Sequence, residues 1–367
     1  MCSSDVGPRC QGEPMTVQEV SLLRLAAQWV AGPGAAGPAD VVRRLGAVQG
    51  QDFPGAVTSV ALRTAVRRRK DVEAALDDGE IVRSWPMRGT LHLLAADDLH
   101  WMLDLLAGRT LAGLTARWAQ LGLEESDAER ARDIVTAALA GGRRMRRADV
   151  LAAIEDGGVT TTGQRGYHLL AYLARTGTLC LGPTDGAGEQ LFVLLDDWVR
   201  APRRMPREEA LAELARRFFL GHGPATVHDL ARWAGIPLRN ARAGSAAARP
   251  DLAVLEVDGV EHLLDPSTAD RLADCREEAG GLILLPGFDE FVLGYRDRSV
   301  ILDSEFAQRI APGNNGMFRP TVVLGGRIVG TWQWTGRGAK RVVTATPFTT
   351  FSEPVTAQIL EAAGRLP

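Results

Sequence analysis

A pattern of helices followed by a pair of strands recurs three times along this chain and limits the folds open to it. The first occurrence has helical apolar spacing in SLLRLAAQWVA, ADVVRRLGAVQ and DVEAALDDG, followed by the strand pair IVRSWPMRGTLHLLA. The second ends in LCLGPTDGAGEQLFVLL, and the third ends in DLAVLEVDGVEHLLD, whose Asp-Gly turn is typical of a hairpin. Three helices and a hairpin make the winged-helix plan, here at intervals of about 80 residues.

Strand patterns dominate the last part of the sequence. They lie in GLILLPGFDEFVLGY, PTVVLGGRIVGTWQWT and KRVVTATPF, and a helix is predicted in EPVTAQILEAAGRL. Gly325 and Gly326 predict a tight hairpin turn, because glycine adopts positive φ at no steric cost. The sequence therefore predicts an α+β fold with three tandem winged helix-turn-helix motifs and a β-rich C-terminal domain. The expected divisions are a disordered leader at 1–14, winged-helix units at 15–120, 121–202 and 203–279, and the β-rich domain at 280–367.

Charge alone does not announce a nucleic-acid partner. The net charge is -3 and the pI is about 6.1, which still permits local positive patches. Lys70 and Lys340 are the only lysines, so the cations are almost all arginine. Arginine suits bidentate contacts to phosphate and guanine, whereas GC-rich coding is the plain alternative explanation.

Motif spacing excludes several classes of chemistry. The four cysteines form no C-x-x-C pair, and no two of the six histidines have ligand spacing on one helical face. Neither a P-loop, a dinucleotide fingerprint nor a G-x-S-x-G elbow is present. We therefore expect no metal and no cofactor. The absence of a signal sequence or a long apolar run predicts a cytoplasmic protein.

Arginine clusters occur near helix starts or connections in the repeated units, at 67–70, 143–147 and 203–207. A single charge run is as often a solvated surface as a binding site. Three on modules of nucleic-acid type favour DNA binding. Candidate phosphate contacts in the middle cluster are Arg143, Arg144, Arg146 and Arg147.

Gln49 and Gln51 form a Q-x-Q pair in AVQGQDFPG, where an apolar helical run is expected to break. In an arbitrary protein such a pair is usually a solvated turn. Asp52 beside it is either a water activator or a helix cap. Asp289 and Glu290 in GFDEF offer acid and base chemistry, but adjacent carboxylates point in different directions, so capping or closing a loop is the favoured interpretation.

Four stretches, LGAVQGQD, RSWPMRGTLHLL, LLPGFDEFVLGY and PTVVLGGRIVGTW, together resemble the winged-helix alkylpurine DNA glycosylases of the AlkZ and YcaQ kind. The likeness covers nearly the whole chain after Thr16 and implies a C-shaped channel for duplex DNA. That family marks its active site by glutamine, apolar residue, glutamine in the AlkZ branch, which Gln49 and Gln51 match. Gly50 departs from the apolar middle position and predicts a looser local backbone.

The resemblance implies that Gln49 and Gln51 are catalytic, and the chemistry is consistent with this. A guanine alkylated at N7, or an adenine at N3, already carries positive charge and leaves without an acid. A glutamine amide can then stabilise the oxocarbenium-like sugar and hold the attacking water. With Lys70 and Lys340 as the only lysines, a Schiff-base lyase step has few candidates, so a monofunctional enzyme is predicted.

Further DNA contacts are expected from two strand pairs. Arg83, Arg88, Thr90 and His92 belong to the first wing, where Thr90 and His92 share one strand face, and Trp85 is either core or part of this motif. Around the later hairpin, residues 322–332, Arg319, Arg327 and Arg337 are candidates for contacts to phosphate or to the lesion.

Double-stranded DNA with an alkylated purine is thus the expected partner of a monomeric enzyme, without a membrane or a nucleotide cofactor. The rival is a winged-helix transcription regulator without catalysis. Regulators of this plan usually dimerise through long helices, and no sustained heptad is visible here. An arginine-rich scaffold without nucleic acid is a third interpretation, which the salt dependence of binding to random duplex would separate.

Overall fold

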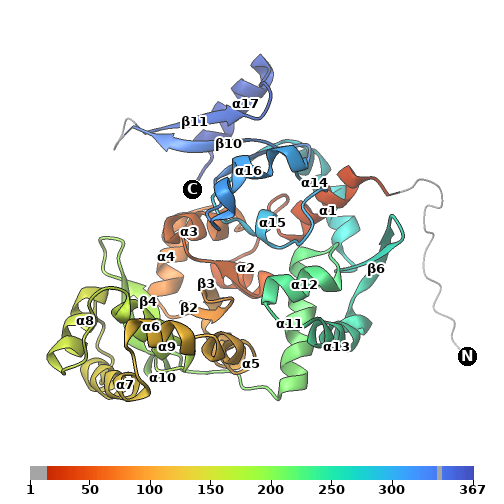
Figure 1. The fold of residues 1–367 in the computed structure, drawn as a ribbon. Coiled ribbons are helices and arrows are strands. Elements are labelled where there is room, and N and C mark those ends of the chain that lie inside the picture. The colour runs from red at the N-terminus through yellow and green to blue at the C-terminus, as the bar shows by residue number, and fades with distance from the viewer. Residues whose placement is uncertain (1–14, 337–340) are drawn as a thin grey trace, which may run out of the picture.

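The computed structural model describes residues 15–336 and 341–367, so the expected leader at 1–14, Arg337 and Lys340 lie outside the described residues. Figure 1 shows α7 and α8 at the lower left, α13 at the lower right, and the hairpin β2–β3 near the centre. The strands β10 and β11 and the helix α17 lie at the top of the same view. The fold is mixed α+β, as predicted.

The N-terminal part contains more elements than its sequence pattern indicated. Its elements are α1 (Val17–Ala27), α2 (Pro38–Leu45), β1 (Val48–Gln49), α3 (Phe53–Leu62), α4 (Arg69–Asp77), β2 (Ile81–Met87), β3 (Thr90–Ala95), α5 (Leu99–Ala112) and α6 (Thr115–Leu121). The helix expected through residues 39–49 was wrong at its end. It stops at Leu45, Gly46 takes a positive φ of 77°, and the chain enters β1.

The middle of the chain twice repeats three helices and a hairpin. The first set is α7 (Glu125–Leu139), α8 (Arg147–Asp156), α9 (Arg165–Arg175), β4 (Leu179–Thr184) and β5 (Gln190–Leu194), followed by α10 (Leu195–Trp198). The second is α11 (Arg207–His222), α12 (Val227–Ala234), α13 (Leu238–Ala248), β6 (Ala253–Val257) and β7 (Val260–Leu264). Asp258 and Gly259 turn this last hairpin with positive φ at both positions, as the Asp-Gly pair predicted.

The C-terminal part mixes strands with short helices. Its elements are α14 (Thr268–Gly280), β8 (Leu282–Leu285), α15 (Glu290–Leu293), α16 (Ala307–Ile310), β9 (Thr321–Leu324), β10 (Arg327–Thr335), β11 (Val342–Pro347) and α17 (Glu353–Gly364). The strand expected through 281–295 ends at Leu285, and α15 follows Pro286 and Gly287. The hairpin at Gly325 and Gly326 is confirmed, with φ of 58° and 79°.

Strands from two of the expected units share one sheet. Its order is β1-β3-β2-β4-β5, and Arg83 on β2 pairs with Leu181 on β4. The second sheet has the order β11-β10-β9-β8, and β6 pairs only with β7. The two-residue strand β1 is therefore the edge of the larger sheet, and β3 is its one neighbour there.

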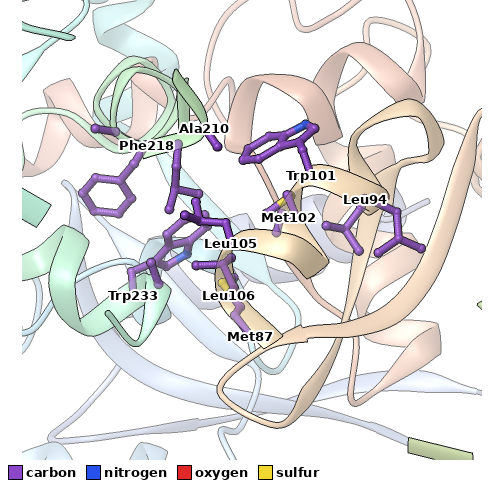
Figure 2. Packing of buried hydrophobic residues seen from close by; sticks show 14 of the residues in the cluster. Met87, Leu94, Trp101, Met102, Leu105, Leu106, Ala210, Phe218 and Trp233 are labelled. Carbon is purple, nitrogen blue, oxygen red and sulfur yellow. The ribbon is translucent and has the colours of Figure 1, made fainter. Parts of the chain in front are cut away.

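The largest apolar cluster joins the β2–β3 hairpin and α5 to α11 and α12. Figure 2 shows Leu105 and Leu106 of α5 beside Trp233, and Trp101, Met102 and Phe218 belong to the same cluster. In a separate cluster, apolar residues of α1 pack with α14, β9 and Phe291 of α15. These contacts hold α12, α15 and the β2–β3 hairpin as neighbours, and the candidate site is built where they meet.

Candidate active site

The glutamine pair lies at the open edge of the larger sheet. Gln49 is the last residue of β1 and lies opposite His92 of β3. Its Oε1 accepts from the backbone N–H of Gln51 at 3.0 Å, and its Nε2 lies 3.4 Å from Thr90 Oγ1. Both the oxygen and the nitrogen of the Gln49 side-chain amide therefore contact other groups of the protein.

The two glutamines differ in exposure. Gln49 is 7% exposed, whereas Gln51 is exposed. Gln51 Oε1 has one long contact, 3.4 Å from the N–H of Leu91. Gln51 thus presents its amide to solvent, while Gln49 supports it from behind.

The backbone of Gly50 is hydrogen-bonded on both sides, which gives no support to the looser backbone expected here. Its N–H donates to Leu91 O at 2.7 Å, and its carbonyl accepts from Arg83 Nε at 2.8 Å. A Cβ on this residue would lie 3.3 Å from His92 Cα and 3.4 Å from Arg83 Nε. The close approach of β3 and Arg83 accounts for glycine at this position.

Arg83 joins the pair to the neighbouring hairpin. Besides Gly50, it donates to Gln190 Oε1 at 2.8 Å, and its guanidinium lies 5.2 Å from the Phe53 ring centroid. Burial lowers the pKa of Arg83 to about 10, and the charge of Asp52 only partly offsets this. Arg83 is thus a desolvated cation beside the glutamines.

His92 was predicted to face the DNA channel, but it lies in the protein interior. It is completely buried, with Nδ1 2.9 Å from Thr90 O and Nε2 2.9 Å from an Nη of Arg88. Burial and then the charge of Arg88 lower the pKa of His92 to about 3, so the ring is neutral at pH 7. Thr90 is half-buried and reaches Gln49, whereas Trp85 belongs to the core.

A buried carboxylate touches the pair from a distant part of the chain. Glu290 Oε1 accepts from the backbone N–H of Gln49 at 2.9 Å. Asp289 turns away, bonds Arg63 through both oxygens at 2.8 Å, and caps α15 at Phe291 N. The capping interpretation of the acidic pair is confirmed for Asp289, but the contact of Glu290 with Gln49 was missed.

Asp52 occupies the N-cap position of α3, yet its side chain makes no capping hydrogen bond. It is exposed and follows Gln51 directly. Of its two predicted roles, the structure therefore supports the position of a cap but not the bond. Its charge acts on the arginines nearby, raising the pKa of Arg83 and of Arg69 against burial.

Arg298 was not singled out from sequence. Its Nε donates to Val292 O at 2.7 Å and its guanidinium lies 5.1 Å from the Phe318 ring centroid. Burial and then the charge of Arg232 lower its pKa to about 10, and the same two causes lower the pKa of Arg88. In the described part of the chain, Arg83, Arg88 and Arg298 form no ion pair with a carboxylate.

The other predicted arginines are differently engaged. Arg143 donates to Ala137 O and Ala140 O at the end of α7, and Arg146 pairs with Asp185. Arg144 and Arg147 lie over the rings of Trp198 and Tyr167, and all four are exposed.

Near the later hairpin, Arg327 pairs with Asp303 at 2.5 Å, and Arg319 contacts Arg309 O at 3.4 Å. The turn of this hairpin packs on α1, where Ser21 Oγ donates to Gly326 O at 2.9 Å. The turn at Gly326 therefore packs against α1, and the approach to DNA expected of residues 322–332 stays a prediction.

Within residues 15–336 and 341–367, no group of three His, Cys, Asp or Glu side chains is arranged to hold a metal. No helix in that same part of the chain is long and apolar enough to cross a membrane.

Comparison with known proteins finds similarity to DNA glycosylases in both structure and sequence. The solved structure of the Streptomyces sahachiroi DNA glycosylase AlkZ superposes with a TM-score of 0.76 at 26% identity, covering 96% of this chain and 98% of that one. A curated relative, the interstrand DNA cross-link repair glycosylase of Streptomyces sahachiroi, is 29% identical over 304 residues, which are 80% of this chain and 81% of the relative. The sequence match and the structure match both point to a DNA glycosylase of Streptomyces sahachiroi.

The family model for DNA glycosylase AlkZ-like proteins matches residues 42–367. The chain belongs to this family. The resemblance inferred from the sequence is confirmed, and the matched range includes the glutamine pair, Glu290 and all the arginines described above.

Proposed function

We propose that this protein is a monofunctional DNA glycosylase that hydrolyses the N-glycosidic bond of cationic N7-alkylguanine, and of N3-alkyladenine. The relative named as a cross-link repair glycosylase supports extending the substrates to bulky and interstrand-crosslinked N7 adducts. In a producer of a DNA-alkylating natural product, such an activity serves self-resistance and base excision repair. The observation that carries the proposal is the pair of glutamines, one buried and one exposed, at the sheet edge.

The geometry suggests how the pair divides its work. Gln49 uses its Oε1 on Gln51 N and turns its Nε2 to Thr90, so it orients Gln51. Gln51 keeps an exposed amide whose oxygen can accept a hydrogen bond from water or face the oxocarbenium-like sugar. Water is then the nucleophile, and the alkylated base leaves neutral without an acid.

DNA contacts near this site are assigned to the desolvated arginines. Arg83 and Arg88 form no ion pair with a carboxylate in the described part of the chain, so their charge is available to phosphate. The exposed arginines at 143–147 supply a second contact region. Three winged-helix motifs around a C-shaped channel, acting as a monomer on duplex DNA, are the arrangement we propose.

Base release from a duplex with one N7-methylguanine tests the proposal, with strand cleavage after alkali as the readout. A duplex with an N7-guanine interstrand crosslink is the second substrate. Wild type should release the base from at least one substrate, and the Gln49→Ala, Gln51→Ala double variant should bind DNA without releasing it. A footprint on one operator without base release would favour the regulator, and a borohydride-trapped covalent complex would contradict the monofunctional chemistry.

A further inference from the structure

Glu290 is a buried carboxylate that the chemistry above does not use. It begins α15 directly after Asp289, and both side chains are completely buried. They point to different partners, Asp289 to Arg63 and Ser59, and Glu290 to the back of the glutamine pair. Only Glu290 touches the strand that carries Gln49.

Three donors from separate parts of the chain converge on Glu290. Its Oε1 accepts from the N–H of Gln49 at 2.9 Å. Its Oε2 accepts from Trp233 Nε1 at 2.9 Å and lies 3.3 Å from His222 Nε2. The other nitrogen of His222 lies 3.2 Å from Phe218 O, so both ring nitrogens face acceptor oxygens.

This environment keeps Glu290 ionised. Burial alone would raise the pKa of Glu290, because it disfavours the charged form. The hydrogen bond and charge of His222, the charge of Arg88 and the N–H of Gln49 together lower it to about 2. The negative charge of the Glu290 carboxylate is therefore held against the backbone N–H of Gln49.

The strand β1 needs such a partner because it lies at the sheet edge. Its neighbour is β3, and the N–H of Gly50 donates to Leu91 O on that side. In an antiparallel pair the N–H groups of successive residues point to opposite sides, so the N–H of Gln49 points away from the sheet. Glu290 takes the place that another strand would have, and β1 is fixed from both sides.

We propose that Glu290 is the positioning residue of this active site: it fixes the backbone of Gln49, and through Gln49 it orients the exposed amide of Gln51. Its charge also favours positive charge developing at the sugar in front of the pair. This inference rests on the glycosylase function proposed above.

Glu290→Gln tests the proposal with little change of shape. The amide oxygen can still accept from Gln49, but an NH₂ group replaces the acceptor of Trp233 and His222. We expect the single-turnover rate of base release to fall by roughly 100-fold, because small misplacements of reacting groups have effects of that order. The dissociation constant for the same duplex should change by no more than about 3-fold, since Glu290 is not exposed to DNA.

Asp289→Asn is the matched control, because Asp289 is equally buried on the same helix and bonds Arg63 instead of Gln49. It should lower the thermal unfolding midpoint as much or more, yet leave the single-turnover rate of the folded protein within about 3-fold of wild type. An active wild type whose rate survives Glu290→Gln, or falls equally in Asp289→Asn, would overturn the positioning role and leave the glycosylase function standing. An inactive wild type would instead count against the function itself.

If Glu290→Gln does not fold, Trp233→Phe tests the positioning role of Glu290 instead. It keeps an aromatic ring in the core and removes one of the donors to Glu290 Oε2. We expect the rate to fall by roughly 10-fold at unchanged DNA affinity, as is common when the outer partner of a functional group is lost. An unchanged rate in this variant would contradict the proposal.

Discussion

Gln49 and Gln51 stand one residue apart, yet their environments differ in a way that separates structural from chemical effects. Gln51→Ala should abolish most base release while changing the free energy of unfolding by less than about 0.5 kcal/mol, because its side chain is exposed. Gln49→Ala should reduce base release and also destabilise the protein by about 1–3 kcal/mol, because it removes the buried acceptor of Gln51 N. Denaturant unfolding and single-turnover base release on both variants check this, and equal stability losses would contradict the assignment.

His92 and Glu290 predict that the protein loses stability in acid in two ranges. The pKa of His92 is about 3 when folded against 6.5 ordinarily, so the unfolded chain binds a proton first as pH falls below 6.5. The pKa of Glu290 is about 2 when folded against 4.5, so its contribution is lost as pH falls from 4.5 toward 2. Both contributions are fully present above about pH 6.5.

The free energy of unfolding measured against pH tests this for wild type and His92→Gln. Each group contributes a slope of up to about 1.4 kcal/mol per pH unit within its range. The neutral glutamine should remove the slope between pH 6.5 and 4.5, and between pH 4.5 and 3 it should leave only the shallower loss due to Glu290. Identical slopes in the two proteins would show that His92 does not titrate as described.

The glutamine pair could be recognised from the sequence, whereas its support could not. Gln49 and Gln51 lie two positions apart in one short motif, but Glu290 lies 241 positions away from Gln49, and only the folded chain brings them together. Arg298 is a similar case, because its pKa is lowered by burial and by the charge of Arg232 on α12, 66 positions before it in the sequence. The GFDEF stretch was noticed, and no local rule could tell that its second acid faces the glutamines.

At the scale of elements, apolar patterning predicted hairpins well and short or interrupted elements poorly. The three hairpins β2–β3, β4–β5 and β6–β7 lie where alternation and turn residues placed them. The strand β1 has two residues, which is too short to show alternation. The helix α3 was not among the expected elements; it starts with Phe53, Pro54 and Gly55, and proline is tolerated in the first turn of a helix.

The hairpin turn at Gly325 and Gly326 offers a test of packing between elements. A Cβ on Gly326 would lie 2.0 Å from Ser21 Oγ of α1, whereas a Cβ on Gly259 of the β6–β7 turn would meet nothing within 4 Å. Both glycines have positive φ, so Gly259→Ala should cost about 1–2 kcal/mol from the backbone alone. Gly326→Ala should cost about 3 kcal/mol or more, because the contact with α1 is added.

Thermal unfolding midpoints of the two alanine variants measure the difference. Adding Ser21→Ala to Gly326→Ala should recover part of the loss, since it removes the atom that the new Cβ meets. Equal midpoints for Gly326→Ala and Gly259→Ala would mean that the turn is not held against α1.

Over the whole molecule, a net charge of -3 has to be reconciled with a DNA substrate. Several arginines form ion pairs with nearby carboxylates, as Arg63 does with Asp289 and Arg249 does with Glu261. Arg83, Arg88 and Arg298 are desolvated without such pairing in the described part of the chain. Arg83 places one such positive charge directly beside the glutamine pair, so local positive charge for DNA is present there although the net charge is negative.

Arg298→Ala tests this distribution through the salt dependence of binding to duplex DNA. Each phosphate contact releases counterions and adds about 0.9 to the slope of log K against log salt concentration. Arg298→Ala should reduce the magnitude of that slope by about 1, and Arg298→Lys should largely keep it, because the charge remains.

The matched control is Arg249→Ala, whose guanidinium is exposed and already paired with Glu261 at 2.7 Å. Glu261 already neutralises the charge of Arg249 within the protein. Arg249→Ala should therefore leave the salt-dependence slope unchanged within error, although the surface loses the same formal charge as in Arg298→Ala. If both alanine variants lowered the slope equally, total charge rather than the unpaired arginines near the active site would govern DNA binding. A lower slope for Arg298→Ala alone would place a DNA phosphate beside Arg298 and Phe318.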